Sequence, residues 1–421
     1  MTGFSPAMRD PDYDVVVVGA RVAGAPTAML LARQGYRVLL LDRMRFPSDM
    51  MSSHFIHAFG IARLARWGLL DRLLATGCPP VDLLASDWGD IKLTGTPPAY
   101  EGINFGVCPR RIVLDQLLID AAVEAGVEFE EATGVVGLNF AADGRVTGVR
   151  ARRSGGQPVD ISARYVVGAD GMRSYVARTV GAAEYNTVPS LTTTFLTYFE
   201  NLPMDRLLIH WRPGRCVPAI PTNDGLTVVL VGWSHNEWQT YRSDVEFHYF
   251  DTIYKNASPE FVERIRDARR AERFVGTHHS PNFFRKPYGP GWVLVGDAGY
   301  HKDPVTALGI ADAFRDVELA ADALHQTMSG EKPAEAAFGY YERRRNELAE
   351  PLYWYTIDQA KYEPLDRMTT LVLTALKDDE EARNRFFGVL AGSVHPEEFS
   401  SLHNVASILI KAGLLQERDY S

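Results

Sequence analysis

The sequence predicts an α/β protein with a parallel-sheet domain, a second domain built on an antiparallel sheet, and a helical C-terminal region. Three observations predict this fold class. A strand, a glycine-containing turn, a helix and a second strand follow one another over residues 13–41, as in a βαβ unit. Residues 191–284 look like antiparallel strands joined by polar turns, and the sequence from Ile310 onward has a mostly helical pattern.

The chain is too long for one small core. Its 421 residues predict two or more domains, and an apolar share of 46% with 11% aromatic residues supports a large buried interior. The net charge of -9 leaves no broad basic surface, and the basic run Arg343-Arg344-Arg345 lies in a helical stretch of mixed charge. We therefore expect no nucleic-acid partner.

The cysteines, Cys78, Cys108 and Cys216, are far apart in the sequence. No CxxC or Cys/His spacing indicates a metal, so we expect neither a metal site nor a disulfide framework. The first twelve residues lack the apolar segment of a signal peptide, and no uncharged apolar run reaches the roughly 18 residues of a membrane span. The expected location is the reducing cytoplasm.

The elements of the first domain follow from hydrophobic patterning. Tyr13–Val18 is a nearly continuous apolar run, typical of a strand buried on both faces. The helix Gly24–Gln34 follows, Gly35 ends it, and Arg37–Leu41 is the second strand. The other expected elements are helices at Ile61–Leu74 and Arg111–Ala125, a hairpin of Val135–Phe140 with Val146–Arg152, and a strand at Tyr165–Gly168.

The pattern changes near Gly181. The strands expected beyond it are Thr192–Phe199, Leu207–Arg212 and Leu226–Trp233, with a helix at Pro259–Arg273 and a return to buried strand at Trp292–Gly296. We therefore predict a discontinuous first domain at 12–185 and 286–328. The second domain takes 186–285, and the C-terminal helical region takes 329–421.

The turn after the first strand carries the motif Gly19-Ala20-Arg21-Val22-Ala23-Gly24. Gly19 permits a tight turn, Gly24 permits close helix–strand packing, and the N–H groups that open the helix can hold a pyrophosphate. Asp42, at the end of the second strand, can accept hydrogen bonds from ribose hydroxyls. This context predicts a dinucleotide site. Arg21 replaces the usual second glycine, and we expect its side chain to swing outward while its charge helps to neutralise the diphosphate.

Two later segments resemble parts of the same site. They are Val166–Ser174, which contains Gly168-Ala169-Asp170-Gly171, and Val295–Ala298, followed by Asp303-Pro304 and Gly309. With these segments and Arg111-x-x-Leu114-x-x-x-Leu118, the chain resembles the FAD-dependent monooxygenases of the p-hydroxybenzoate hydroxylase type, or group A flavoprotein monooxygenases. That superfamily also includes flavin halogenases and geranylgeranyl-reductase-like enzymes. The resemblance spans roughly residues 13–325 and implies a Rossmann-like FAD-binding domain.

The resemblance implies how FAD is held. Asp297 contacts the ribityl chain, Arg111 reaches the cofactor, and the middle segment with Asp170 takes part in FAD and nicotinamide binding. Asp303-Pro304 forms a rigid turn beside the isoalloxazine, and the helix that starts at Gly309 offers N–H donors to anionic reduced flavin. The residues expected at FAD are Gly19, Arg21, Val22, Ala23, Gly24, Asp42, Arg43, Arg111, Asp170, Gly296, Asp297, Asp303, Gly309 and Ile310.

The resemblance also implies an activity. NAD(P)H, bound transiently, reduces FAD, and molecular oxygen then gives a flavin hydroperoxide that hydroxylates an aromatic or polyketide-like small molecule, as in secondary metabolism. The expected catalytic residues are His54, His210, His235 and Pro304. His210 or His235 would deprotonate a phenol, whereas His54 would bond a flavin edge or merely fix its loop. The sheet over Leu191–Phe284 is expected to form the substrate-binding surface, with Tyr198 as a candidate contact. Trp211 and Trp233 are either substrate contacts or core residues.

Three other functions stay open. A reductase or dehydrogenase acting on an alkene or polyene would use the same flavin face. A halogenase is less favoured, because Pro218-Ala219-Ile220-Pro221 keeps only the Ile-Pro of that subgroup's Trp-x-Trp-x-Ile-Pro stretch. A binding protein without flavin is disfavoured by the presence of all three segments. The substrate, the choice between NADH and NADPH, and the oligomeric state, a homodimer included, are not determined by these patterns.

Overall fold

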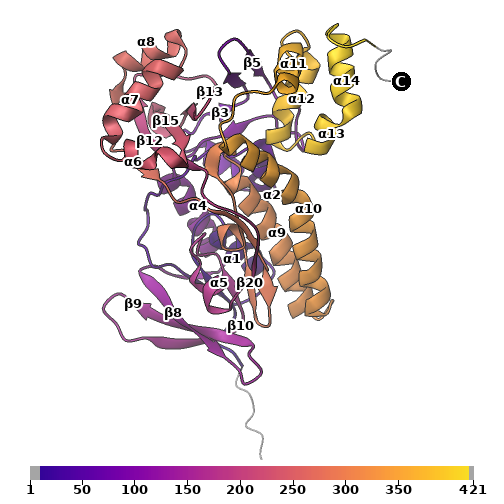
Figure 1. Ribbon diagram of the computed structural model, residues 1–421. Helices are drawn as coiled ribbons and strands as arrows, with labels where there is room; N and C mark the ends of the chain where they lie inside the picture. Colours follow the sequence, from indigo (N-terminus) through magenta and orange to yellow (C-terminus); the bar gives the residue numbers. More distant parts are fainter. Residues whose placement is uncertain (1–9, 417–421) are drawn as a thin grey trace, which may run out of the picture.

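The structure, a computed structural model, describes residues 10–416 (Figure 1). Two large sheets lie one above the other in the view of Figure 1, and the C-terminal helices gather beside the upper sheet. The expectation of no signal peptide rests largely on residues 1–9, which lie outside the described residues. Within 10–416, no helix is long and apolar enough to cross a membrane.

The first sheet is the predicted parallel sheet. Its strands, in spatial order, are β7 (Glu128–Glu130), β2 (Val38–Leu41), β1 (Tyr13–Val18), β10 (Val159–Gly168), β20 (Trp292–Leu294) and the antiparallel edge strand β19 (Tyr288–Gly289). Val15, Val16 and Val17 of β1 are fully buried, since both faces of the sheet are covered. A hairpin of β8 (Thr133–Phe140) and β9 (Val146–Arg153) pairs with the first half of β10.

The helices α1 (Gly24–Arg33), α4 (Arg111–Glu124), α9 (Gly309–Met328) and α10 (Ala334–Ala360) contribute to one hydrophobic core with this sheet. The predicted helix Ile61–Leu74 is wrong as a single element. It is divided into α2 (Ala58–Arg66) and α3 (Leu70–Leu74). Gly68, with φ of +75°, ends the first of these segments because glycine adopts the left-handed conformation without steric cost.

The second sheet runs in the order β16 (Arg269–Arg270), β12 (Thr192–Glu200), β15 (Thr227–Ser234), β14 (Arg215–Pro221), β13 (Leu207–Arg212), β4 (Leu84–Asp87) and β5 (Lys92–Gly95), with β17 (Val275–Thr277) beside β12. It is antiparallel except where β13 pairs in parallel with β4. Strands β4 and β5 come from residues that we assigned to the first domain. The predicted boundary at residue 185 therefore separates strands that belong to one sheet.

One face of the second sheet is covered by α7 (Val245–Asn256), which the sequence analysis missed, and by α8 (Pro259–Asp267), which ends before the predicted Arg273. A small third sheet consists of β11 (Glu184–Val188), β18 (Asn282–Arg285) and β21 (Tyr300–His301). Its first two strands lie at the predicted domain boundaries. The short strands β3 (Pro80–Val81) and β6 (Gly106–Val107) pair separately.

The C-terminal region is helical, as predicted. Beyond α10 it consists of α11 (Arg367–Ala375), α12 (Glu380–Ala391), α13 (Pro396–Ser400) and α14 (Leu402–Lys411). Residues of α11, α12 and α14 share a hydrophobic core with the second sheet, on the face opposite α7 and α8. The second sheet is therefore covered on both faces, by different parts of the chain.

Candidate functional site

Glycines bring the three motif segments into contact. A Cβ on Gly19, whose φ is +102°, would lie 2.5 Å from the carbonyl oxygen of Ala169, and a Cβ on Gly24 would lie 1.7 Å from that of Gly19. Gly296 approaches the first segment in the same way, since its Cβ would be 2.7 Å from the Cβ of Ala23. The first segment is thus packed directly against the second and the third, in a space that only glycine leaves free.

Two helices begin at this junction without a side-chain cap. The N-cap residues are Ala23 for α1 and Leu308 for α9, and neither side chain accepts a hydrogen bond from its helix. Gly309 is exposed, and a Cβ there would meet nothing within 4 Å. Uncapped N–H groups at a helix start suit a negatively charged ligand group.

Asp42 lies at the end of β2, as predicted, and is held by the backbone. Its Oδ2 accepts a hydrogen bond from the N–H of Ala20 at 2.8 Å, and its Oδ1 accepts one from the N–H of Met44 at 2.8 Å. Each oxygen keeps a further lone pair, so the carboxylate still suits ribose hydroxyls. Arg43 is exposed beside it.

Arg21 does turn away from the glycine turn, but toward a specific partner. Its Nη1 lies 2.5 Å from Oδ2 of the fully buried Asp115, its Nη2 donates to Ser48 Oγ at 2.8 Å, and its guanidinium carbon lies 5.1 Å from the centre of the Phe46 ring. Arg111 donates to the same carboxylate at 2.9 and 3.0 Å. Two cations therefore share one anion, which leaves a positive charge beside the first segment.

Asp170 and Asp297 have different surroundings. Asp170 accepts hydrogen bonds from Ser174 Oγ at 2.5 Å and the N–H of Tyr175 at 2.6 Å, at the start of α5 (Tyr175–Thr179). Burial raises the pKa of this carboxyl. Asp297 is exposed between two buried neighbours, and its carboxylate makes no hydrogen bond within residues 10–416. Asp297 is thus available to ribityl hydroxyls, whereas both oxygens of Asp170 already serve a helix start.

The Asp303-Pro304 turn joins the third segment to the second sheet. Asp303 Oδ1 accepts from the N–H of Val305 at 3.1 Å, and Oδ2 accepts from Thr192 Oγ1, at the start of β12, at 2.7 Å. Burial raises the pKa of Asp303 to about 7. Ala307 is held at φ of +53°, a left-handed conformation that is unusual for a residue with a Cβ. The turn is therefore constrained by neighbours from both domains.

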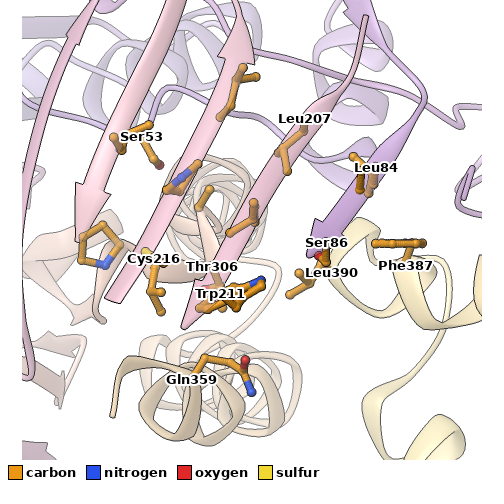
Figure 2. Close-up of a pocket in the computed structure, with 18 of the residues that line it drawn as sticks. Ser53, Leu84, Ser86, Leu207, Trp211, Cys216, Thr306, Gln359, Phe387 and Leu390 are labelled. Carbon is orange, nitrogen blue, oxygen red and sulfur yellow. The ribbon is translucent and has the colours of Figure 1, made fainter. Parts of the chain in front are cut away.

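A cavity lies between this turn and the second sheet (Figure 2). Pro304–Ala307 forms one wall, strands β4 and β13–β15 form another, and the C-terminal region closes it with Tyr355, Gln359 and Phe387. The lining is mostly apolar, with Leu207 and Trp211 from β13. The arrangement can hold a largely apolar small molecule away from water, against the turn that we expect beside the flavin.

His210 is wrongly predicted as a base in this cavity. Side chains alternate along β13, so Leu207, Ile209 and Trp211 line the cavity while His210 faces the helices on the other side. There its Nε2 lies 3.3 Å from Ser258 Oγ. Trp233 is also core, since it stacks on Tyr241 on that same face.

His54 and His235 do not line the cavity. His54 is buried with φ of +62°, and its Nε2 lies 2.7 Å from the hydroxyl oxygen of Tyr198. Burial, with added repulsion from Arg111 and Arg110, lowers the pKa of His54 to about 3. It is therefore too weak a base for a phenol near neutral pH and instead holds Tyr198. His235 lies in the turn after β15, where its N–H donates to the carbonyl of Leu191.

His57 is the histidine that does line the cavity, and the sequence analysis missed it. Its Nε2 lies 3.1 Å from the carbonyl oxygen of Thr306, which assigns the proton to Nε2. Nδ1 is buried without a partner in the described part of the chain, and burial lowers the pKa of this imidazole to about 4. The sequence signal that could have pointed to His57 was its position just after Ser52-Ser53-His54, the segment in which His54 was proposed.

Known proteins of three activities are similar to this chain. The digeranylgeranylglycerophospholipid reductase of Methanocella arvoryzae is 26% identical over 349 residues, which cover 81% of this chain and 85% of the reductase. The rifampicin monooxygenase of Streptomyces venezuelae is 28% identical over 329 residues, which cover 72% of this chain and 62% of the monooxygenase. The solved structure of a myxobacterial chondrochloren halogenase superposes with a TM-score of 0.77 at 22% identity, covering 97% of this chain and 98% of that one.

The identities are low, and the similar proteins carry out different reactions, so they do not assign a substrate. The halogenase structure supports the fold alone. Each of these similarities extends over most of the chain. The FAD binding domain family matches residues 12–353. The chain therefore belongs to the FAD binding domain family, as an FAD-dependent oxidoreductase of the group A flavoprotein superfamily.

Proposed function

We propose that the protein is a monooxygenase that hydroxylates an aromatic or polyketide-like small molecule, with NAD(P)H as transient reductant and molecular oxygen as co-substrate. The observation that carries this proposal is the apolar cavity against Pro304–Ala307. When bound, FAD supplies redox and oxygen-activating chemistry. Oxygen transfer needs the acceptor ring held close to the flavin and water excluded, and this cavity suits both needs.

Different residues would bind the parts of FAD and the substrate. The α1 start and the charged Arg21 and Arg111 would hold the diphosphate, and Asp297 the ribityl chain. The α9 start would face the flavin ring. Trp211 and its apolar neighbours would orient the substrate, and His57 would hold the Thr306 carbonyl in the wall of the cavity through Nε2. Because burial lowers the pKa of His57 to about 4, its ring stays neutral near pH 7 and brings no charge to this apolar site.

A reductase acting on an alkene or polyene is the second candidate. It is favoured by the 26% identical reductase of Methanocella arvoryzae, and an apolar cavity suits a polyene as well as an aromatic ring. We also propose a cytoplasmic location, because Cys78, Cys108 and Cys216 are all free thiols.

Aerobic NAD(P)H oxidation by the FAD-loaded protein, tested with phenols, polyketide aromatics and polyenes under ¹⁸O₂, separates the two candidates. A product that gains one labelled oxygen supports the monooxygenase. A product that gains two hydrogens, formed equally without oxygen, overturns it in favour of the reductase.

A matched pair of variants tests the place of the substrate. Ile209→Phe fills the cavity and should lower product formation about tenfold or more while FAD stays bound. Leu208→Phe, next along β13 and facing the helix-covered side, is the control. Equal product loss in both variants would contradict this cavity as the substrate site.

A further inference from the structure

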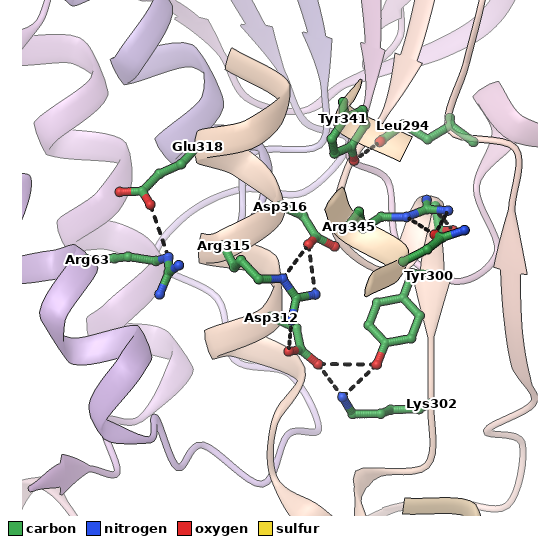
Figure 3. Close-up of polar contacts among 12 residues, drawn as sticks. Arg63, Leu294, Tyr300, Lys302, Asp312, Arg315, Asp316, Glu318, Tyr341 and Arg345 are labelled. Atoms are coloured by element: carbon green, nitrogen blue, oxygen red, sulfur yellow. Dashed lines mark hydrogen bonds and ion pairs between the residues drawn. The ribbon is translucent and has the colours of Figure 1, made fainter. Parts of the chain in front are cut away.

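A buried charged cluster lies behind the first turn of α9 (Figure 3). Its members are Lys302, Asp312, Arg315 and Asp316, and each side chain is at most 5% exposed. None of the four lines the substrate cavity. We propose that Lys302 and Asp312 tune the flavin from behind α9: Lys302 favours negative charge on the flavin edge that faces this helix, and Asp312 opposes it.

The contacts make Asp312 the centre of the cluster. Lys302 Nζ pairs with Asp312 Oδ2 and donates to the hydroxyl of Tyr300 at 2.7 Å. The Tyr300 hydroxyl in turn donates to Asp312 Oδ2 at 3.4 Å. On the other side, Arg315 Nη1 donates to Asp312 Oδ1 at 2.8 Å. Both oxygens of this carboxylate are thus bound by cations.

Asp316 balances the charge one turn further along the helix. Its Oδ1 accepts from Arg315 Nε at 2.9 Å and from Nη2 at 2.8 Å, while its Oδ2 has no partner among residues 10–416. The cluster is therefore neutral as a whole. Lys302 and Asp312 are the two members nearest the start of α9, because Arg315 and Asp316, which are bonded to each other, lie about one turn farther along the helix.

The cluster is close enough to act on a group at the helix start. Asp312 follows Gly309 by three residues, about 4.5 Å along the axis at the rise of an α-helix. Lys302 immediately precedes the Asp303-Pro304 turn that leads into α9. Buried charges are screened little by salt, so each acts over this distance more strongly than a surface charge would.

Packing alone does not account for these residues. Apolar side chains of similar volume commonly replace a buried ion pair without loss of stability. The charges also lie beneath an uncapped helix start, where N–H groups already favour negative charge. Lys302 adds to that preference and Asp312 limits it, so the pair would set how easily the flavin accepts electrons.

Opposite shifts in two single variants test the proposal. The holoprotein is titrated with sulfite, which adds to oxidised flavin and leaves negative charge on its pyrimidine edge, and the midpoint potential of FAD is measured in parallel. Lys302→Gln should weaken sulfite binding about tenfold and lower the potential by about 30 mV for a two-electron couple. Asp312→Asn should strengthen sulfite binding and raise the potential by similar amounts.

Three further variants separate tuning from loosened packing. Lys302→Arg keeps the charge and should stay within about twofold of wild type. If Lys302→Gln does not fold, the upward shift in potential expected of Asp312→Asn still tests the proposal. The double variant Lys302→Gln/Asp312→Asn should return toward wild type. Glu318→Gln removes an acid farther along α9 that pairs with Arg63 and Arg66, and should leave both readings unchanged.

Shifts in the same direction for Lys302→Gln and Asp312→Asn, or none in either, would overturn the proposal, as would a tenfold shift in Lys302→Arg. The inference rests on the placement of the flavin against α9, which belongs to the proposed function. Neither readout needs a substrate. Opposite shifts without any hydroxylated product would therefore contradict only the proposed reaction.

Discussion

The starts of α1 and α9 can be compared directly, since both lack a side-chain cap and both follow a left-handed residue. At α1 that residue is Gly19, and Gly24 lets the backbone of the turn and the helix touch. At α9 it is Ala307, and Gly309 stands in open space. Close backbone contact requires glycine, so the start of α1 carries a recognisable glycine motif. The start of α9 makes no such contact, so fewer of its positions require a particular residue.

The charged residues behind the two ends are also arranged alike. Asp115 is bound by Arg21 and Arg111, and Asp312 is bound by Lys302 and Arg315. In each case one buried carboxylate holds two cations. The second cluster adds Asp316 and is neutral, so the α1 end keeps the larger positive charge, as suits a diphosphate.

The largest effect is expected from Asp115→Asn. It leaves the buried Arg111 and the partly buried Arg21 without a counter-charge, which should cost about 3–5 kcal/mol of unfolding free energy. Urea unfolding measures this. Asp120→Asn on the exposed side of the same helix, where the carboxylate accepts a hydrogen bond from Gln116, should change stability by less than about 0.5 kcal/mol. Equal losses would mean that Asp115 does not hold the two arginines.

Asp303, before the α9 end, should make stability depend on pH. Its folded pKa of about 7 lies above the ordinary value of 3.8, so the folded state holds its proton longer than the unfolded state. This contribution is complete below about pH 4, is lost as pH rises through 7, and is on the order of 4 kcal/mol. Asp303→Asn should therefore gain stability relative to wild type between pH 4 and pH 8. A constant difference in flavin-free protein would contradict this.

The smallest effect is expected from Ala307→Gly. Glycine relieves the left-handed strain, worth about 1–2 kcal/mol, but adds freedom to the unfolded chain, worth about 0.5–1 kcal/mol. The net gain in the unfolding free energy should be at most about 1.5 kcal/mol, measured by urea unfolding. A loss of more than 1 kcal/mol would show that the Ala307 methyl group makes contacts that outweigh the strain.

Much of the fold was predictable because local patterns carry it. The βαβ unit, the hairpin and strand β13 follow from short apolar runs and turn residues, and the structure confirms them within a residue or two. The second sheet was only partly predicted. β4 and β5 lie about a hundred residues before the strands they join, and no local pattern reveals a partner at that distance.

The candidate site was also predicted only in part. The glycine segments and the Asp303-Pro304 turn were identified from residue type, because a backbone at close approach admits few residues. The histidines were not, since a histidine's role depends on which way it faces. His210 differs from its neighbours Ile209 and Trp211 only by the alternation of the strand, yet that alternation removes it from the cavity.

By itself, then, the sequence determined the βαβ unit, the likeness to FAD-dependent enzymes and the place of the turns that meet at the motif segments. Proline fixes φ, and glycine permits backbone conformations and close approaches that other residues do not, so the positions of both report structure directly. The tertiary structure alone decided that His57 and the C-terminal Tyr355 line the cavity, that Arg21 shares Asp115 with Arg111, and that Lys302 meets Asp312 behind α9. Side chains acquire burial and partners only when distant segments pack together, and burial and partners set their charge and chemistry.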